Sequence, residues 1–342
     1  EAKPPTRRRR NGKSPMKILI LHSEVPADAG EDELDCLTQA AAVGEAVLAL
    51  GCRPETLPFG MDLRANIDRI RERQPDVVFN LVETLAGQGS LNYVATALLD
   101  VLRMPYTGCR TEAMFITSNK PLAKKILQQN GIATPPWMTA DVDERGSEPH
   151  GTYLLKPCWE DASVGLDSGA IVQMQNPQTL RDALRKRQIA LGLDCFAEAY
   201  IDGREFNIAL LASAQEVLVL PPAEILFVDY PQDKPKVLDY RAKWVENSFE
   251  YDHTVRSLTL APQDGSLAER LRDIALRCWR LFGLRGYARV DFRVDEQGVP
   301  WVLEINANPC LSPDAGFAAA LDFAGMEYAV AIDAILQDAF KP

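Results

Sequence analysis

Residues 286–313, GYARVDFRVDEQGVPWVLEINANPCLSP, decide the fold expected for this chain. Apolar and polar side chains alternate over 287–294, residues 295–298 supply turn chemistry, and a strand pattern resumes over 299–305. This alternation around a short polar turn predicts a β-hairpin.

The predicted hairpin gathers four polar side chains on one face. With a tight turn at 295–298, Arg289 lies opposite Glu304, and alternation along each strand puts Asp291 and Asn306 on the same side. Three oxygen-bearing side chains suit a hard cation such as Mg2+, and the arginine suits a phosphate or an oxyanion. The alternative is an ordinary amphipathic hairpin with a solvated charged face. Against it, a glutamate inside the apolar run WVLEI needs a partner.

Composition bounds the class of protein. A chain of 342 residues with 46% hydrophobic content can bury large cores and suggests two or three domains. Residues 1–15 hold six basic side chains and one acidic, so we expect a disordered basic tail on a body of net charge −16. Such a body repels nucleic acid. No apolar run approaches the roughly 20 residues that span a bilayer, and the N-terminus lacks the apolar segment of a secretory signal, so we expect no membrane partner.

Cysteine and histidine usage argues against several site types. Seven cysteines occur without any Cys-x-x-Cys pair, and none of the three histidines has a partner at metal-ligand spacing. A disulfide framework, a zinc site and histidine-based catalysis are therefore disfavoured, and a reducing cytoplasm is the simplest setting.

The first third of the chain alternates strand and helix patterns. We expect strands within 16–24 and 76–81 and helices over 34–50 and 91–103, which together predict a small parallel sheet. Functional groups of such sheets lie on loops at the strand ends. Glu24 and Glu83 occupy two of these ends, either as ordinary exposed acids or as ligands for a substrate ammonium.

The middle of the chain offers candidate phosphate contacts. In TSNKPLAKKILQQNG a helix is expected, capped by Ser118 and ended by a glycine. Lys156 interrupts the apolar strand YLLKP, either as a phosphate ligand or as an edge lysine whose charge reaches solvent. The small-residue turn around Ala162 and Ser163 could fold over phosphates through backbone N–H groups.

Residues 195–211, CFAEAYIDGREFNIALL, are expected to form one strand carrying Glu198 and Glu205. Backbone left unpaired at 199–201 could bind an adenine edge, and Glu205 could accept ribose hydroxyls. A later helix over 266–281 is predicted to begin with a capping box led by Ser266 and to pack behind the hairpin.

Seven motifs in order, spanning about residues 16–337, resemble the ATP-grasp superfamily and within it the D-alanine–D-alanine ligase branch: MPYTG, TSNKPLAKKIL, the KP to SVG stretch, EAYIDGREF, DYRAKW, GYARVDF and LEINANP. The resemblance implies an α/β fold, α+β overall, with ATP clamped between a central and a C-terminal sheet. The implied domains are an N-terminal α/β domain over 16–115, a central domain over 116–203 and a C-terminal catalytic domain over 204–342.

The resemblance also implies site residues. The ATP contacts would be Lys120, Lys156, Ser163, Glu198, Ala199, Ile201, Glu205 and Lys243, the last from a mobile loop. The metal ligands would be Asp291, Glu304 and Asn306, for Mg2+, with Mn2+ as the alternative ion. Arg289 would stabilise the tetrahedral intermediate and act with Lys243 in catalysis.

The implied reaction is ATP-dependent ligation of a carboxylate and an amine through an acyl phosphate. Family D-alanine ligases surround the first amino acid with a glutamate, a serine and a tyrosine, but this chain has no glycine pair in its first loop, Ala162 at the serine position and Trp244 at the tyrosine position. The serine for the second carboxylate maps near Ala315. We therefore expect an amino-acid substrate other than D-alanine, in a pocket that includes Glu24 and Glu83. The alternatives are D-alanine–D-alanine ligase itself and a non-catalytic ATP-binding regulator, and a homodimer is expected by family analogy.

Overall fold

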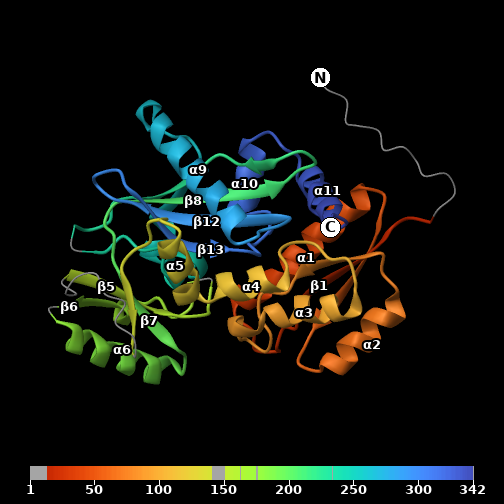
Figure 1. Ribbon diagram of the computed structural model, residues 1–342, viewed down its shortest axis with the longest axis horizontal. Helices are drawn as coiled ribbons and strands as arrows, with labels where there is room; N and C mark the ends of the chain where they lie inside the picture. The colour runs from red at the N-terminus through yellow and green to blue at the C-terminus, as the bar shows by residue number, and fades with distance from the viewer. Residues whose placement is uncertain (1–13, 141–150, 162, 175, 233, 342) are drawn as a thin grey trace.

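Three β-sheets organise the computed structural model of the chain, which describes residues 14–140, 151–161, 163–174, 176–232 and 234–341 (Figure 1). Each sheet lies inside one of the three ranges predicted as domains, and the exact boundaries stay predictions. Apart from residues 14 and 15, the predicted basic tail lies outside the described residues. Within the described part of the chain, no helix combines the length and the apolar character that crossing a bilayer requires.

The first sheet is parallel, in the order β2-β1-β3. Its strands and the helices around them are β1 (Lys17–Ser23), α1 (Glu31–Ala49), β2 (Arg53–Phe59), α2 (Leu63–Arg73), β3 (Val77–Leu81), the 3-10 turn η1 (Gly89–Leu91) and α3 (Tyr93–Leu102). Ile18 and Ile20 of β1 pack with α1, whereas Leu19 and Leu21 pack with α2 and α3. Because both faces of a parallel sheet are covered, β1 reads as one apolar run.

The sequence analysis missed β2 and α2 and began the first helix at 34 instead of at Glu31. β2 reads RPETLPF, and two prolines argue against a central strand. At the edge of this sheet β2 has only β1 as a partner, so the missing N–H donors are tolerated.

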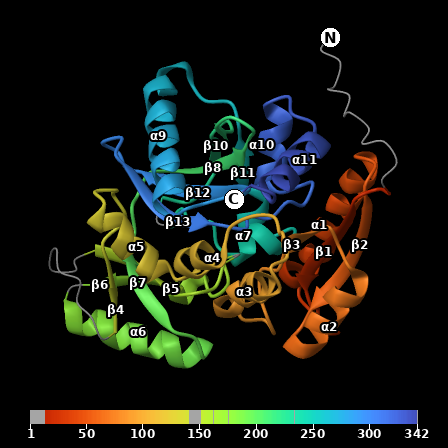
Figure 2. The same ribbon diagram turned by 45° about the vertical axis from the view of Figure 1, so that its right-hand side comes forward.

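The second sheet is antiparallel, in the order β4-β7-β5-β6. The elements of this part of the chain are α4 (Thr111–Ser118), α5 (Lys120–Gln129), β4 (Trp137–Thr139), β5 (Gly151–Pro157), η2 (Ser168–Ala170), β6 (Ile171–Met174), α6 (Pro177–Leu191) and β7 (Cys195–Ala199). Leu180 and Leu184 of α6 pack on Leu155 and Ala197, so α6 covers one face, as Figure 2 shows.

The third sheet runs β11-β10-β8-β12-β13, with β9 beside β8. Its elements are β8 (Arg204–Ala212), β9 (Val217–Val219), β10 (Ala223–Phe227), α7 (Tyr240–Trp244), α8 (Phe249–Asp252), β11 (Thr254–Ser257), η3 (Pro262–Asp264), α9 (Gly265–Leu281), β12 (Tyr287–Val294), β13 (Pro300–Asn306), α10 (Gly316–Phe323) and α11 (Tyr328–Asp338). On one face α9, α4 and α5 share a core with β12 and β13, which confirms the predicted packing of the late helix. On the other face α10 and α11 share a core with β1 and α1, so this sheet is joined to the first one.

The predicted single strand over 195–211 is wrong. It divides into β7 and β8, which belong to different sheets. The break holds turn chemistry: Asp202 Oδ1 accepts a hydrogen bond from Gly203 N at 2.9 Å, and Gly203 has φ +142°.

Two predicted helix caps are also wrong. The α5 helix is capped by Asn119, whose Oδ1 accepts from Leu122 N at 2.9 Å, and not by Ser118. α9 begins at Gly265 after the 3-10 turn η3, so its N-cap is Asp264 and the box led by Ser266 is not used. In both cases the helix starts within two residues of the predicted cap.

The hairpin is present, with a register that differs from the prediction by two residues. Arg289 lies opposite Asn306, and Asp291 lies opposite Glu304. Val294 pairs with Pro300, so the turn is longer than expected, and an irregularity after Asp291 adds a further residue. A slip of two residues returns every side chain to the same face, so the predicted grouping of the four polar residues survives.

Candidate active site

A cavity of about 680 Å³ lies where the three sheets meet. All the site residues predicted within the described chain line it: Glu24, Glu83, Lys120, Lys156, Ser163, Glu198, Ala199, Ile201, Glu205, Lys243, Trp244, Arg289, Asp291, Glu304, Asn306 and Ala315. The predicted turn residue Ala162 lies outside the described residues. The sequence prediction therefore brought together residues from every part of the chain.

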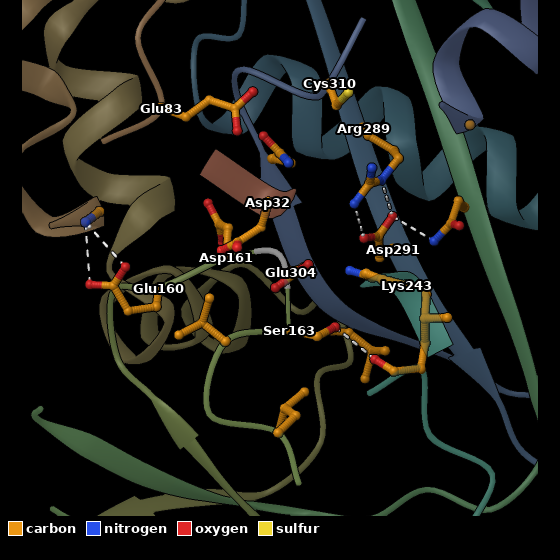
Figure 3. A pocket seen from close by; sticks show the side chains of 18 of the residues that line it. Asp32, Glu83, Glu160, Asp161, Ser163, Lys243, Arg289, Asp291, Glu304 and Cys310 are labelled. Atoms are coloured by element: carbon orange, nitrogen blue, oxygen red, sulfur yellow. Dashed lines mark hydrogen bonds and ion pairs between the residues drawn. The ribbon is translucent and has the colours of Figure 1, made fainter. Parts of the chain in front are cut away.

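Strand β12 presents a guanidinium paired with a carboxylate. Arg289 donates from Nε to Asp291 Oδ1 at 2.7 Å and from Nη2 to Oδ2 at 2.8 Å. Asn207, on the neighbouring strand β8, donates to the same Oδ1 at 2.8 Å. Burial raises the pKa of Asp291 while the arginine opposes that shift. Figure 3 shows this pair facing the cavity from the sheet.

Glu304, directly across from Asp291 on β13, is surrounded by cations. Lys120 Nζ lies 3.7 Å from Glu304 Oε2 and donates to Glu160 O at 2.7 Å and to Asp161 Oδ1 at 2.8 Å. Burial alone would raise the pKa of Glu304, but the charges of Lys120 and the other cavity cations lower it to about 2. This carboxylate is therefore ionised at neutral pH.

Lys243 comes from α7, a five-residue helix where a mobile loop was expected. The helix is capped by Asp239, whose Oδ1 accepts from Ala242 N at 2.9 Å. Figure 3 shows the Lys243 amino group beside Asp291 and Glu304. Burial and the charge of Arg289 lower the pKa of Lys243, and within the described chain no carboxylate lies at ion-pair distance from it. An anion bound in the cavity would supply the missing partner.

Asp291, Glu304 and Asn306 fit a hard cation by their donor chemistry. Two carboxylates face each other across β12 and β13, and Asn306 supplies an amide oxygen that also accepts from Asn308 N at 3.0 Å. Among the described residues there is no group of three or more His, Cys, Asp or Glu able to hold a metal alone. Mg2+ needs no such group, because it commonly binds one or two carboxylates, waters and substrate phosphates.

Glu198 is buried between two lysines, one of which the sequence analysis missed. Its carboxylate pairs with Lys156 Nζ at 2.5 Å and with Lys124, and these charges lower its pKa against the effect of burial. Lys124 also donates to Thr134 Oγ1 at 2.8 Å. Lys124 follows Lys120 by one helical turn, so helix periodicity could have identified it. The ion pair with Glu198 holds the side chain of Lys156 in place near the end of β5.

The backbone at residues 199–201, which was predicted to be unpaired, is partly hydrogen-bonded. Ala199 N donates to Pro136 O at 2.8 Å and Tyr200 N to Thr152 O at 2.9 Å, so these two N–H groups are already paired. Glu205 pairs with Arg293, whose Nη2 lies 3.2 Å from Oε2, and burial raises the pKa of Glu205. The carboxylate nevertheless lines the cavity.

The end of the cavity nearest the first sheet is rich in carboxylates. Burial raises the pKa of Glu83 to about 7, and Gln39 Nε2 donates to Glu83 Oε1 at 2.8 Å. Asp35 of α1 accepts from Ser312 Oγ and from Cys310 Sγ, the latter at 2.9 Å. The sequence analysis proposed Glu83 but missed Asp35, whose partners Cys310 and Ser312 lie 275 and 277 positions away in the chain.

Three segments from different parts of the chain meet over the cavity. Ser163 Oγ donates to Leu238 O at 2.7 Å, and Tyr240 OH donates to Asp32 Oδ1 at 3.0 Å. Glu160 accepts from Gly89 N at 3.2 Å. Figure 3 shows the Glu160 and Ser163 contacts. The turn after β5, the segment before α7 and the first-sheet loops thus close over one another.

Two antiparallel sheets that enclose a cavity with lysines on one side and a hairpin acid pair on the other define the ATP-grasp class. Residues 126–337 match the family model for the D-ala D-ala ligase C-terminus. The D-alanine–D-alanine ligase of Moorella thermoacetica is 32% identical over 321 residues, covering 90% of this chain and 96% of that protein. The chain belongs to this family, a group of ATP-dependent carbon–nitrogen ligases.

The chain is also similar to a second sequence relative and to a solved structure. A protein of Sinorhizobium fredii named "Uncharacterized protein y4sG" is 32% identical over 275 residues, covering 79% of this chain and 76% of that one. The crystal structure of the D-alanine–D-alanine ligase from Bacillus anthracis complexed with ATP superposes with a TM-score of 0.70 at 20% identity, covering 96% of this chain and 97% of that one. The structural likeness confirms the predicted fold.

Proposed function

We propose that the chain joins a carboxylate to an amine through an acyl phosphate, with ATP and Mg2+, on an amino-acid substrate other than D-alanine. The observation that carries the proposal is the convergence of Lys120, Lys243 and Arg289 on the facing carboxylates Asp291 and Glu304. Charge neutralisation and positioning are the main needs of phosphoryl transfer.

The cations have separate tasks in this proposal. Lys120 and Lys156 are held by protein acids at the end of the cavity where the second sheet meets the third, and they face the ATP phosphates. Lys243, which has no carboxylate at ion-pair distance in the described chain, contacts the transferred phosphoryl group. Ser163 belongs to the turn that covers the phosphates.

The base and sugar of ATP would lie next to Lys156, at the end of β7 and the start of β8. Ala199 and Ile201 would line the adenine, with Glu198 acting behind them by holding Lys156. Glu205 would accept ribose hydroxyls beside its arginine partner.

Asp291, Glu304 and Asn306 would hold Mg2+, with Mn2+ as an alternative ion of similar preference. The bound ion supplies charge neutralisation and orientation for the phosphates. The ionised state of Glu304 favours this role at neutral pH.

In the first step an oxygen of the substrate carboxylate attacks the γ-phosphorus of ATP, and the bond to ADP breaks. In the second step the amine attacks the acyl carbon, and inorganic phosphate leaves as the amide forms and the amine loses its proton. Arg289 lies beside the metal acids and offers its guanidinium to the oxyanion that develops in the second step.

The substrate end supports a molecule other than D-alanine. Trp244 and Ala315 replace the hydroxyl-bearing residues expected of family D-alanine ligases, and Glu24 and Glu83 add carboxylates nearby. The named relatives favour D-alanine as the alternative substrate. ATP dependence and seven free cysteines support a cytoplasmic setting, and a homodimer stays a proposal from the family.

The proposal is tested by measuring ADP and phosphate release for amino acids supplied in pairs, with mass detection of the product. We expect release with a pair that excludes D-alanine and a product lighter than the two substrates by one water. Stimulation by D-alanine alone would establish the alternative substrate. No release with any amino acid or amine would favour a non-catalytic ATP-binding protein.

The role of Arg289 is tested separately by Arg289→Ala. We expect ATP binding to persist while kcat/KM for ligation falls by about 100- to 1,000-fold, the usual effect of losing one oxyanion donor. Calorimetric titration with ATP and the ligation assay measure the two properties. Arg64→Ala, which changes an arginine whose side chain is 81% exposed on α2, is the control. Loss of nucleotide affinity with unchanged turnover at saturation would contradict the role.

A further inference from the structure

Arg293 is a buried arginine of the cavity lining that has no task in the proposed chemistry. It lies on β12 directly across from Glu205 on β8, and alternation along β12 places it on the same face as Asp291. Only 5% of its side chain is exposed. A guanidinium buried to this extent needs partners for its charge and for its N–H groups, so its neighbours indicate what it holds in place.

The guanidinium contacts three parts of the chain at once. Its Nη2 lies 3.2 Å from Oε2 of Glu205, the acid proposed to accept the ribose hydroxyls. Its Nη1 donates to Gly203 O at 3.0 Å, within the β7–β8 connection. Nη2 also donates to Lys236 O, in the segment that precedes α7. The planar fork of arginine allows separate acceptors to be reached from fixed positions in this way.

The backbone of Lys236 is held through both of its polar groups. Its N–H donates to Tyr200 OH at 3.1 Å, whereas its carbonyl accepts from Arg293. The two residues that hold it are themselves close, because Arg293 Cζ lies 5.5 Å from the centroid of the Tyr200 ring, within the range of a cation–π contact. The Phe227 ring lies at the same distance from Cζ. The segment that leads to Lys243 is therefore fastened beside the proposed ribose acid.

Arg293 also acts on the charge state of Glu205. In the described chain, Arg293 is the cation at ion-pair distance from this carboxylate, which is itself buried. Burial raises the pKa of Glu205, and the charge of Arg293 opposes that shift. An ionised carboxylate accepts hydrogen bonds and donates none, so it suits the pair of hydroxyls on a ribose.

We infer that Arg293 is a positioning residue that holds Glu205 for the ribose hydroxyls and, through Lys236, holds the segment that brings Lys243 to the phosphates. The inference rests on the proposed function, since it takes Glu205 as the ribose acid. It adds that recognition of the sugar and placement of Lys243 depend on one guanidinium. The competing view is that the ion pair of Arg293 with Glu205 only stabilises the third sheet.

Nucleotide binding tests the first half of the inference. Calorimetric titrations with Mg2+ compare ATP, 2′-deoxy-ATP and 3′-deoxy-ATP on the wild type and on Arg293→Met, which keeps an unbranched side chain without the charge. In the wild type we expect each deoxy analogue to bind about 10-fold more weakly than ATP, as for loss of a hydrogen bond to a charged group. In Arg293→Met we expect ATP to bind about 10-fold more weakly and the deoxy analogues to bind like ATP, because Glu205 has lost the partner that fixes it.

Turnover tests the second half. The assay uses saturating ATP and the amino-acid pair that gives the fastest ADP release. We expect kcat of Arg293→Met to fall by about 10- to 100-fold, because Lys243 is less well placed. Tyr200→Phe removes the acceptor of the Lys236 N–H and leaves Arg293 and Glu205 in place. We expect it to lower kcat as well, while its preference for ATP over the deoxy analogues stays that of the wild type.

Two further variants complete the design. Arg293→Lys keeps a charge beside Glu205 without the planar fork, so it should recover part of the preference for ATP and little of the lost kcat. Melting temperatures verify that each variant is folded, and Arg293→Lys takes the place of Arg293→Met if the latter does not fold. Arg64→Met, at an arginine whose side chain is 81% exposed on α2, is the matched control and should behave as the wild type.

An Arg293→Met enzyme that keeps the wild-type preference for ATP would overturn the link to the ribose. Unchanged kcat in Arg293→Met and Tyr200→Phe would overturn the link to Lys243. A lower melting temperature with both properties unchanged would establish the purely structural role. A wild type that binds ATP and its deoxy analogues equally well would overturn the inference while ligation stands. Absence of ATP binding to the wild type would instead remove the proposed function, and the inference with it.

Discussion

The pKa values of two carboxylates in the same cavity shift in opposite directions because the residues around them differ. Glu304 lies 3.7 Å from Lys120 and near other cations, which bring its pKa to about 2. Glu83 stands beside Gln39 and near Asp35, so burial raises its pKa to about 7. A neutral amide cannot replace a positive charge as a partner for a buried carboxylate. One acid is thus ready for a cation, whereas the other holds a proton into the neutral range.

This difference predicts a pH effect on stability at Glu83. The folded pKa of about 7 exceeds the ordinary value of 4.5, so the folded state holds the extra proton between these pH values. The free energy of unfolding should therefore decrease as pH rises through this window, by at most about 3 kcal/mol from this group. Glu83→Gln should remove that decrease, so the free energy of unfolding of the variant should gain on that of the wild type as pH rises.

Urea unfolding at about pH 5 and about pH 8 measures the effect as the difference between wild type and Glu83→Gln. Glu45→Gln, at an exposed position on α1, is the matched control. A difference between wild type and Glu83→Gln that does not change with pH would show that burial does not hold the proton on Glu83.

The site residues that could be predicted from the sequence are charged residues that stand in otherwise apolar strands. Lys156 and Glu304 are single charges in apolar strands, and burial of a charge requires a partner. Asp35 was missed because it lies in a helical segment where a charged residue is ordinary. Its significance comes from Ser312, 277 positions away, which only the tertiary fold brings near.

Among the elements, the hairpin of β12 and β13 was predictable and the connection from β7 to β8 was not. Alternation fixes which face each hairpin residue occupies, and a two-residue slip preserves it. In the stretch 195–211 the apolar pattern continues across the break, so the change of sheet leaves only the Asp202–Gly203 turn as a signal. Turn chemistry at one dipeptide is weaker evidence than alternation over eight residues.

The β7–β8 connection predicts a large cost for Gly203→Ala. Gly203 has φ +142°, and a Cβ there would lie 2.0 Å from Val294 O, a backbone atom at the end of β12. Backbone strain and this clash together should lower the free energy of unfolding by at least about 3 kcal/mol. Gly192→Ala is the matched control, because Gly192 has φ +67° with nothing within 4 Å of the added Cβ, so only strain of about 1 kcal/mol is expected.

Denaturant unfolding of both glycine variants shows how much of the stability lost in Gly203→Ala comes from the clash with Val294 O and how much from backbone strain. If the two variants lose similar stability, the approach of β12 to the connection is looser than the structure shows. A much larger loss in Gly203→Ala would show that the close approach of the β7–β8 connection to β12 contributes to the stability of the fold.

For the whole molecule, three sheets that fold from separate parts of the chain must meet before the site exists. The first and third sheets share a core through α1 and α11, so their relation is fixed by packing. The second sheet is linked to the first through hydrogen bonds of loops, such as Glu160 with Gly89. Loops held by a few hydrogen bonds open more easily than packed cores. The contacts between the second sheet and the first are therefore weaker than those between the first and the third.

The hydrogen bond between Tyr240 and Asp32 leads to a prediction for Tyr240→Phe: ATP should be consumed without a matching amount of amide product. Tyr240 OH donates to Asp32 Oδ1 at 3.0 Å and so ties the segment that carries Lys243 to α1. An acyl phosphate is open to hydrolysis whenever water enters, and a closed loop excludes that water. Loss of one hydrogen bond, worth about 1 kcal/mol, should leave the fold intact but loosen the closure. We expect ADP release to exceed amide formation in Tyr240→Phe, measured as the ratio of the two products. The wild type should form ADP and amide in equal amounts. The control Tyr93→Phe, which removes a hydroxyl away from the cavity lining, should do the same. An equal ratio in Tyr240→Phe would mean that the remaining contacts, chiefly Ser163 with Leu238, are sufficient to keep water out.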